Sequence, residues 1–208
     1  MGLDIFFHKV KKVRKSKSEP FVMTIEEVDK LNNKRAKDRV RKFGERVVKS
    51  LERIDSDSYV DFYENNFIAK LPKYTKYSFK YAKMAESVKD VDEVKDFFKI
   101  FVDRIYADAD AYFRKVNFVY KYFEPKLEDE CCFVTKSDLE DMIMRCDMVL
   151  ENPKKAHELL PTRAGFFFGS TDYDEWYFKD VEDVRKQFKK LLDGFNEDTD
   201  VIYVCMSW

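Results

Sequence analysis

Residues 131–150 read CCFVTKSDLEDMIMRCDMVL, and this segment combines the signals of a strand and of a helix. The run Cys131–Thr135 is short, apolar and rich in β-forming residues, which is typical of a strand. Ser137 and Glu140 then form a capping box, which predicts the start of a helix. The apolar residues that follow recur at helical spacing: Leu139, Met142, Ile143, Cys146, Val149 and Leu150. A strand leading directly into an amphipathic helix favours an α+β fold.

Further strands are predicted at the two ends of the chain. Residues 1–8 are rich in Ile and Phe, and residues 200–207 include the run Val-Ile-Tyr-Val. We expect these two segments and residues 130–135 to form one small, antiparallel sheet of about three strands. Apolar spacing predicts helices packed on this sheet at about residues 92–106, 109–123, 137–150 and 174–193, and further helices at 58–70, 77–88 and 153–160.

Length and composition indicate one folded domain. The chain has 208 residues, of which 45% are hydrophobic and 16% aromatic, so it can bury a core and is not a disordered chain. We expect a single α+β domain over residues 1–208, with a basic, partly helical insertion at about residues 11–54. The helix predicted at 24–54 has a polar middle, which we expect to be solvated or broken. No apolar run approaches the roughly 18 residues that span a bilayer, so no membrane partner is expected.

Charge is unevenly distributed along the chain. Residues 1–50 hold 15 basic and 7 acidic residues, whereas residues 124–208 hold 11 basic and 20 acidic residues. The basic end could steer a nucleic acid, or the two ends could attract each other or another copy of the chain. A nucleic-acid partner is possible but not favoured, because the basic segment has few stacking aromatics. The candidate phosphate-binding residues are Lys11, Lys12, Arg14, Lys15, Lys34, Arg35 and Arg39.

Cysteine usage indicates a reducing compartment. Cys146 falls on the apolar stripe of a predicted helix, and Cys205 falls in a predicted strand. At the N-terminus the charges follow a short apolar stretch, which is the reverse of their order in a secretory signal. We therefore expect four reduced thiols and a cytoplasmic protein.

The residues that could bind metals or act as nucleophiles lack the spacing of a known site. There is no Cys-x-x-Cys pair, and neither His8 nor His157 has a second His at ligand spacing. The acidic runs lack the glycine and oxygen ligands of a calcium loop. We predict no metal, no cofactor and no catalytic residue, and an enzyme is the less favoured class.

The segment Gly165–Trp176 reads GFFFGSTDYDEW and is the main candidate for a functional surface. Either glycine could adopt a positive φ or allow close backbone approach. Asp172 with Glu175, or Thr171 with Asp174, could cap the helix that follows. One interpretation is a capped helix with an aromatic plug. The other is a pocket rim that presents Arg163, Ser170, Thr171, Tyr173 and Trp176.

A second group of polar residues could belong to the same surface. The helical spacing places Asn117 toward the packed face, where a buried amide needs hydrogen-bond partners. Asn117 could satisfy a loop carbonyl, or it could complete a polar site with Asp4, Arg114 and Arg163.

Several short segments resemble a group of small uncharacterised proteins of bacteriophages, prophages and gut bacteria. Those proteins begin Met-Gly-Leu-Asp, as this chain does, and they carry the Gly-Phe-Phe-Phe-Gly-Ser-Thr-x-Tyr-Asp-Glu motif found here at 165–175. Their Tyr-Trp-Arg-Lys-x-Asn and Ser-Ser-Trp motifs match 112–117 and 206–208, with Phe113 and Met206 as departures. The resemblance covers residues 1–8 and about 106–208, and it implies ancestry and location more than chemistry, because the group has no established activity.

These observations favour a non-enzymatic, intracellular interaction protein of phage or mobile-element type that binds a host protein or a ligand. One alternative is a small-ligand or nucleotide-handling enzyme with a site formed by Arg114, Asn117, Arg163 and the turn Gly169–Trp176. The other is a nucleic-acid-binding accessory protein that uses the basic N-terminal arm. A concave pocket with converging Arg and Asn side chains would favour the enzyme, and a flat aromatic patch would favour the interaction protein.

Overall fold

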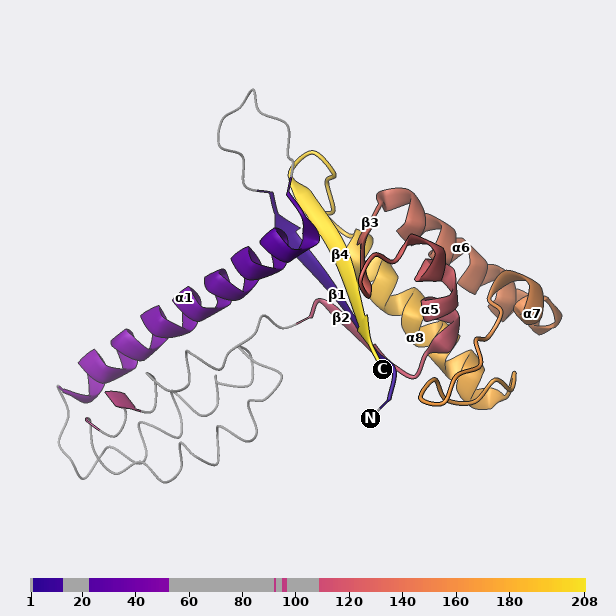
Figure 1. Ribbon diagram of the computed structural model, residues 1–208, viewed down its shortest axis with the longest axis horizontal. Helices are drawn as coiled ribbons and strands as arrows, with labels where there is room; N and C mark the ends of the chain where they lie inside the picture. The colour runs from indigo at the N-terminus through magenta and orange to yellow at the C-terminus, as the bar shows by residue number, and fades with distance from the viewer. Residues whose placement is uncertain (1, 13–22, 53–91, 93–94, 97–108) are drawn as a thin grey trace. The chain divides into compact units, whose positions relative to one another are not determined.

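The computed structural model describes residues 2–12, 23–52, 92, 95–96 and 109–208, and its fold is α+β, as predicted (Figure 1). The chain divides into two compact units, one formed by Met1–Ile25 with Ala109–Trp208 and the other by Glu26–Asp108. The expectation of a single domain with an insertion at 11–54 stays a prediction. Within the described ranges, no helix is long and apolar enough to cross a membrane.

The first unit contains a four-stranded sheet with the strand order β2-β1-β4-β3. Its strands are β1 (Asp4–Lys11), β2 (Ala111–Arg114), β3 (Cys131–Val134) and β4 (Asp200–Ser207), and every neighbouring pair is antiparallel. The long strands β1 and β4 lie side by side in the centre, with the two short strands at the edges (Figure 1). The three predicted strands are therefore confirmed in one sheet, and β2 is an additional strand.

The helix predicted at 109–123 is wrong in its first half. Residues 111–114 form β2, and the helix α5 covers only Asn117–Phe123. Between them Lys115 has a φ of 62°, a left-handed conformation that interrupts any helix. The apolar side chains of Phe113 and Val116 fit one helical stripe in the sequence, but in the fold they belong to different elements.

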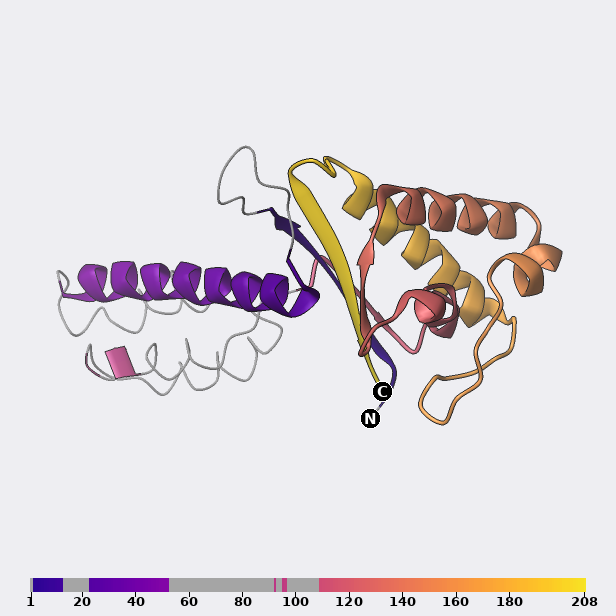
Figure 2. The ribbon, with the colours of Figure 1, turned by 45° about the horizontal axis from the view of Figure 1, so that its top comes forward.

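Helices cover one face of the sheet (Figure 2). The main ones are α5, α6 (Lys136–Glu151) and α8 (Glu175–Leu192), accompanied by the short helices η4 (Glu124–Lys126), η5 (Pro153–Lys155) and α7 (Ala156–Leu159). The helices predicted at 137–150, 153–160 and 174–193 are confirmed. In the core the ring of Phe7 contacts Phe188 of α8 and Phe123 of α5, with centroid distances of 5.0 and 5.6 Å.

The start of α6 differs from the predicted capping box. Thr135 is the N-cap, and its side chain accepts a hydrogen bond from the backbone N–H of Asp138. The backbone N–H of Thr135 in turn donates to the carboxylate of Asp138 at 3.0 Å. The box therefore begins two residues before the predicted pair of Ser137 and Glu140. The buried carboxylate of Asp138 also pairs with Lys126.

The outer edge of β2 is occupied by a side chain of α8. The backbone N–H of Tyr112 donates to Oε1 of Gln187 at 3.2 Å, and Nε2 of Gln187 donates to the Tyr112 carbonyl at 3.5 Å. The side-chain amide of Gln187 thus forms hydrogen bonds with both the N–H and the carbonyl of Tyr112, as the backbone of a neighbouring strand would.

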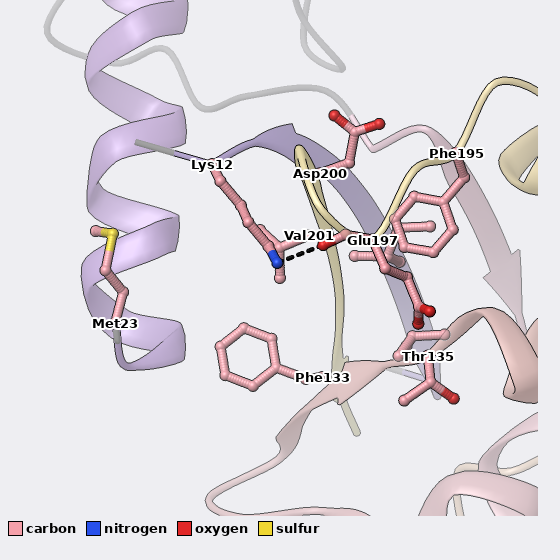
Figure 3. A pocket seen from close by; sticks show the side chains of 10 residues that line it. Lys12, Met23, Phe133, Thr135, Phe195, Glu197, Asp200 and Val201 are labelled. Carbon is pink, nitrogen blue, oxygen red and sulfur yellow. Dashed lines mark hydrogen bonds between the residues drawn. The ribbon is translucent and has the colours of Figure 1, made fainter. Parts of the chain in front are cut away.

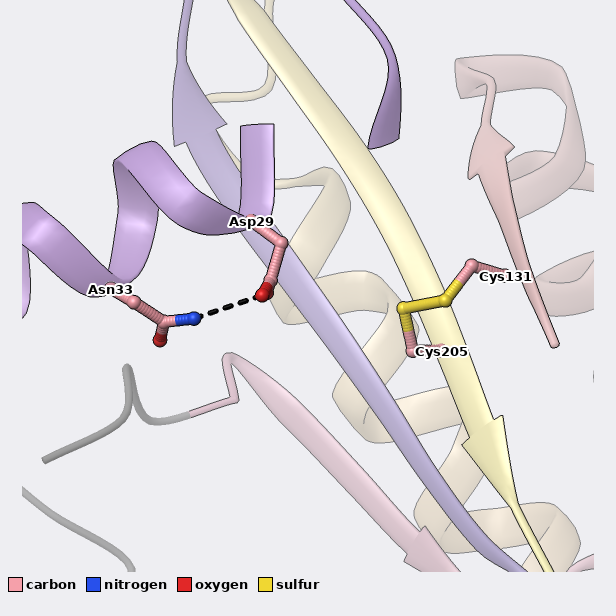
Figure 4. The surroundings of a disulfide bond; sticks show 4 residues. All are labelled: Asp29, Asn33, Cys131 and Cys205. Atoms are coloured by element: carbon pink, nitrogen blue, oxygen red, sulfur yellow. Dashed lines mark hydrogen bonds between the residues drawn. A yellow bond between two sulfur atoms is a disulfide. The ribbon is translucent and has the colours of Figure 1, made fainter. Parts of the chain in front are cut away.

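A disulfide links the edge strand β3 to β4 (Figure 4). Cys131 and Cys205 are direct partners in the sheet register, with Cα atoms 4.2 Å apart. The backbone N–H of Met206 donates to the carbonyl of Glu130 at 2.9 Å. The neighbouring pair, Cys131 and Cys205, is therefore a non-hydrogen-bonded pair of the antiparallel ladder, the kind in which opposite side chains lie closest together.

This disulfide corrects the expectation of four free thiols. Cys132 and Cys146 are free and buried, as predicted for Cys146, but Cys131 and Cys205 are oxidised. Adjacent residues of a strand point to opposite faces of the sheet, so Cys131 meets Cys205 whereas Cys132 enters the core. Burial raises the pKa of Cys132 to about 11 and that of Cys146 to about 12, so neither thiol is reactive at neutral pH.

The second unit is described mainly through α1, which covers Ile25–Leu51. This helix is continuous through its polar middle, so of the two alternatives expected there, solvated or broken, the break is absent. Intrahelical ion pairs such as Glu26–Lys30 and Asp38–Arg41 are compatible with a helix that is polar on much of its surface. The helices predicted at 58–70 and 77–88 lie outside the described residues, as does most of 92–106, where Asp92, Lys95 and Asp96 are helical.

Candidate functional site

The loop of residues 161–174 is held by the buried side chain of Asn117. Its Nδ2 group donates to the carbonyls of Phe168 and Ser170 at 3.2 and 2.7 Å, and its Oδ1 atom accepts from the backbone N–H of Arg163 at 3.2 Å. The amide therefore bonds both sides of the loop at once. The interpretation that Asn117 satisfies loop carbonyls is confirmed, and its hydrogen-bonding capacity is largely used within the protein.

Two residues with left-handed backbone meet beneath this loop. Gly169 has a φ of 91° and lies against Lys115, whose φ is 62°. A Cβ atom on Gly169 would lie 3.1 Å from the Lys115 Cβ and 3.3 Å from its carbonyl oxygen. Glycine is favoured at this position, because a side chain there would be strained by the positive φ and would lie close to Lys115.

Further hydrogen bonds join the loop to β1 and to itself. The backbone N–H of Leu3 donates to the carbonyl of Phe167 at 3.0 Å, which joins the loop to the start of β1. The hydroxyl of Thr162 donates to the Thr171 carbonyl at 3.1 Å, and its backbone N–H donates to the hydroxyl of Tyr173 at 3.3 Å. The loop is irregular but internally bonded along its length.

The loop exposes some of its aromatic side chains and buries others. Phe166 is 96% exposed and Trp176, in the first turn of α8, is 66% exposed. Phe168 is buried instead, with its ring 4.7 Å from Tyr120. The interpretation of an aromatic plug therefore describes Phe168, whereas Phe166 and Trp176 are surface residues.

A cavity of about 320 Å³ lies beside the loop. It is lined by the segment Lys115–Phe118, by loop residues between Gly169 and Asp174, and by the first two turns of α8. Of the site residues predicted from sequence, Asn117, Ser170 and Trp176 line it. The others, Asp4, Arg114, Arg163, Thr171 and Tyr173, are absent from its lining.

The cavity is acidic. Its lining contains the carboxylates of Asp172, Asp174 and Asp180 and the ammonium group of Lys115. Asp174 caps α8 by accepting from the backbone N–H groups of Trp176 and Tyr177, both at 3.0 Å, which corrects the predicted caps. Asp172 accepts from the hydroxyl of Ser170 at 3.1 Å.

Asp180 differs from the other two carboxylates. Among the residues that the structure describes, it has no hydrogen-bond or ion-pair partner, and its side chain is half-buried. Burial, together with the nearby carboxylates of Asp183 and Asp174, raises the pKa of Asp180 to about 6. The sequence analysis did not select Asp180, because its place in the cavity depends on how the loop folds over α8.

The remaining predicted polar residues make separate contacts. The hydroxyl of Tyr112 donates to Asp4, and burial, followed by this bond, raises the pKa of Tyr112 to about 12. The guanidinium of Arg163 bonds to Glu124 at 3.0 Å and to the carbonyl of Ala164 at 3.1 Å. The hydrogen bond between Arg163 and Asn117 therefore involves the backbone of Arg163 and not its guanidinium. Neither Arg114 nor Arg163 lines the cavity that Asn117 lines.

The described residues of the basic arm differ in their surroundings. Lys11 pairs with Asp200 at 2.5 Å, and the ammonium group of Lys12 donates to the carbonyl of Glu197. Lys12 also lines a separate cavity of about 340 Å³ with Phe133 and Phe195 (Figure 3). On α1, Lys34 and Arg39 are exposed and Arg35 is half-buried, whereas Arg14 and Lys15 lie outside the described residues.

Within the part of the chain that the structure describes, no group of three or more His, Cys, Asp or Glu side chains is arranged to hold a metal ion. Comparisons with protein-family models, with curated proteins and with solved structures find no match for this chain.

Proposed function

We propose that the protein is a non-enzymatic binding protein of phage or mobile-element type that acts in the cytoplasm and binds a host protein. Its recognition surface is the loop of residues 161–174 with the first two turns of α8. The observation that carries this proposal is that Phe166, in a loop held by the side chain of Asn117, and Trp176, in the adjoining first turn of α8, are both mainly exposed. Large aromatic side chains presented in this way are common hot spots of protein interfaces.

The way the loop is fixed supports a role in binding. A flexible loop loses conformational entropy when a partner immobilises it, whereas a loop that is already ordered does not. The three hydrogen bonds of Asn117 and the contact of Gly169 with Lys115 order this loop in the free protein. The exposed rings can therefore contribute their burial energy to affinity with little ordering cost.

The sequence resemblance supports the phage-type origin. The Gly-Phe-Phe-Phe-Gly-Ser-Thr motif that resembles phage and prophage proteins is the motif that forms this loop. Phe168 and Gly169 are needed for its conformation, but Phe166 is exposed and has no comparable structural role. An exposed aromatic side chain in a loop fixed by its own contacts is consistent with a binding surface.

The alternative functions receive less support. The carboxylates of Asp172 and Asp180 in the cavity disfavour a phosphate group, and the guanidinium of Arg163 is bonded to Glu124, so a nucleotide-handling enzyme is not the preferred interpretation. Lys11 is paired with Asp200, which favours the balancing of acidic surface over the tracking of phosphates.

Affinity capture from a bacterial host lysate tests the proposal when it compares matched variants. Phe166→Ala and Trp176→Ala should each lose a host protein that the wild type retains, with melting temperatures unchanged because both side chains are mainly exposed. Met144→Ala is the control, because Met144 is 52% exposed on α6 and lies outside the loop. Retention of the same proteins by all four forms would contradict the proposal.

A further inference from the structure

The cavity beside the loop has the size of a subsite for one side chain. Its volume of about 320 Å³ lies at the lower end of ligand pockets, which run from about 300 to 1,000 Å³. It adjoins the exposed ring of Trp176, which is part of its lining. A partner that contacts Trp176 therefore lies beside the cavity. The arginine subsite inferred for the cavity rests on the proposed function.

The charged residues that line the cavity favour a positively charged ligand. The carboxylates of Asp172, Asp174 and Asp180 outnumber the ammonium group of Lys115. Asp172 and Asp174 already accept hydrogen bonds within the loop and at the start of α8, whereas Asp180 has no partner among the described residues. A half-buried carboxylate without a partner is unfavourable, and a cation placed beside it relieves that cost.

An aromatic wall narrows the choice among cations. The indole ring of Trp176 already attracts the ammonium group of Lys179, which lies 4.3 Å from the ring centroid. A planar guanidinium combines stacking on an aromatic ring with paired hydrogen bonds to a carboxylate, which an ammonium group cannot do. Trp176 and Asp180 line the same cavity and are separated by one helical turn of α8.

We infer that the cavity binds an arginine side chain of the protein partner, with its guanidinium paired to Asp180 and lying against the indole of Trp176. Phe166 and the outer part of Trp176 contact the surrounding apolar surface of the partner. The site therefore recognises an exposed arginine flanked by apolar residues.

This binding depends on the ionisation of Asp180. Its carboxyl group has a pKa of about 6, raised by burial and by Asp183 and Asp174. Lys115 is the cationic residue in the lining of this cavity, where Asp172 is the other acidic residue. Above pH 6 the carboxylate is charged and attracts the guanidinium, and as the pH falls through 6 it becomes neutral and the attraction is lost.

The test uses N-acetyl-arginine methylamide and its uncharged isostere, N-acetyl-citrulline methylamide, as NMR probes. At pH 7.5 the arginine probe should cause a saturable shift of the Trp176 indole signal, and the citrulline probe should bind at least tenfold more weakly. Affinity for the arginine probe should fall at least tenfold at pH 5. Asp180→Asn should abolish binding, whereas Glu182→Gln, an exposed carboxylate of the same helix, should not.

Equal binding of citrulline, undiminished binding by Asp180→Asn or the absence of a saturable shift would overturn the inference. The proposed function fails separately from it. If the probes do not bind but Phe166→Ala still loses the captured protein, the arginine subsite is wrong and the binding surface stands. If the arginine probe binds but the loop variants capture the same proteins as the wild type, the subsite stands and the proposed function is wrong.

Discussion

The edge strand β3 and the loop of residues 161–174 are both peripheral segments, but different chemistry secures them. The strand is joined to β4 by backbone hydrogen bonds and by the disulfide Cys131–Cys205. The loop has no regular backbone pairing and depends on side-chain bonds from Asn117 and on the space left by Gly169. A disulfide lowers the conformational entropy of the unfolded chain, whereas the hydrogen bonds of Asn117 exist only in the folded loop. The two segments should therefore respond differently to substitution.

The largest effect is expected at the disulfide. Replacing both Cys131 and Cys205 with Ser removes a link between residues 74 positions apart. The loop-entropy relation for that separation gives a loss of about 4 kcal/mol in the free energy of unfolding. Denaturant titration of the oxidised protein and of the variant measures this difference. Thiol titration of the denatured, unreduced protein should find the two free groups of Cys132 and Cys146, and four groups would contradict the disulfide.

Asn117→Ala should have the next largest effect. It removes three hydrogen bonds, one buried and two part-buried, at about 1 kcal/mol each, so we expect a loss of about 3 kcal/mol. The variant should also lose partner capture, although the side chain itself is not exposed. Asn117→Asp keeps the acceptor for Arg163 and loses the donors, and a stability equal to that of the wild type would show that the donated bonds are unimportant.

Gly169→Ala tests the contact beneath the loop. The positive φ and the short distance to Lys115 should together cost about 2 kcal/mol. Gly194 provides a matched control, because it also has a positive φ but a Cβ atom there would meet nothing within 4 Å. Gly194→Ala should therefore cost only about 1 kcal/mol. Equal melting temperatures for the two variants would assign the whole effect at Gly169 to backbone conformation.

The smallest effect, and one of opposite sign, is expected for Asp180→Asn. The folded-state pKa of Asp180 is raised to about 6, so its ionisation destabilises the folded protein above that pH. Asn resembles the neutral acid, and at pH 7 the variant should be more stable by about 1 kcal/mol, a value reduced because the group is partly solvated. The gain should vanish below about pH 4, where the carboxyl is neutral in both states. A gain that is independent of pH would contradict this assignment.

The sequence predicted the regular parts of the fold better than the surface between them. The strand and helix at 131–150 are indicated by local apolar patterns, and those patterns remain in the structure. The strand β2 could not be separated from α5, because the break is a left-handed Lys115 and lysine gives no signal for that conformation. The disulfide was missed because it depends on the register between β3 and β4, which the residue pattern does not contain.

The candidate site was predicted only in part, for a similar reason. Asn117 and the glycines could be selected because their residue types impose local requirements on the backbone. Phe166 and Phe168 belong to the same run of Phe, but one is exposed and the other buried, and composition does not distinguish them. Asp180 enters the site only after the loop folds across the start of α8.

The amide of Gln187 has a consequence for how copies of this protein meet. An unoccupied edge strand offers its backbone groups to any other extended chain, which is the first step of amyloid-like assembly. At β2 the backbone N–H and carbonyl of Tyr112 are already hydrogen-bonded to the side chain of Gln187. Arg114, the last residue of β2, adds a positive charge to the same edge. An incoming strand must displace the amide before it can pair, so one side chain of α8 protects this edge of the sheet from aggregation.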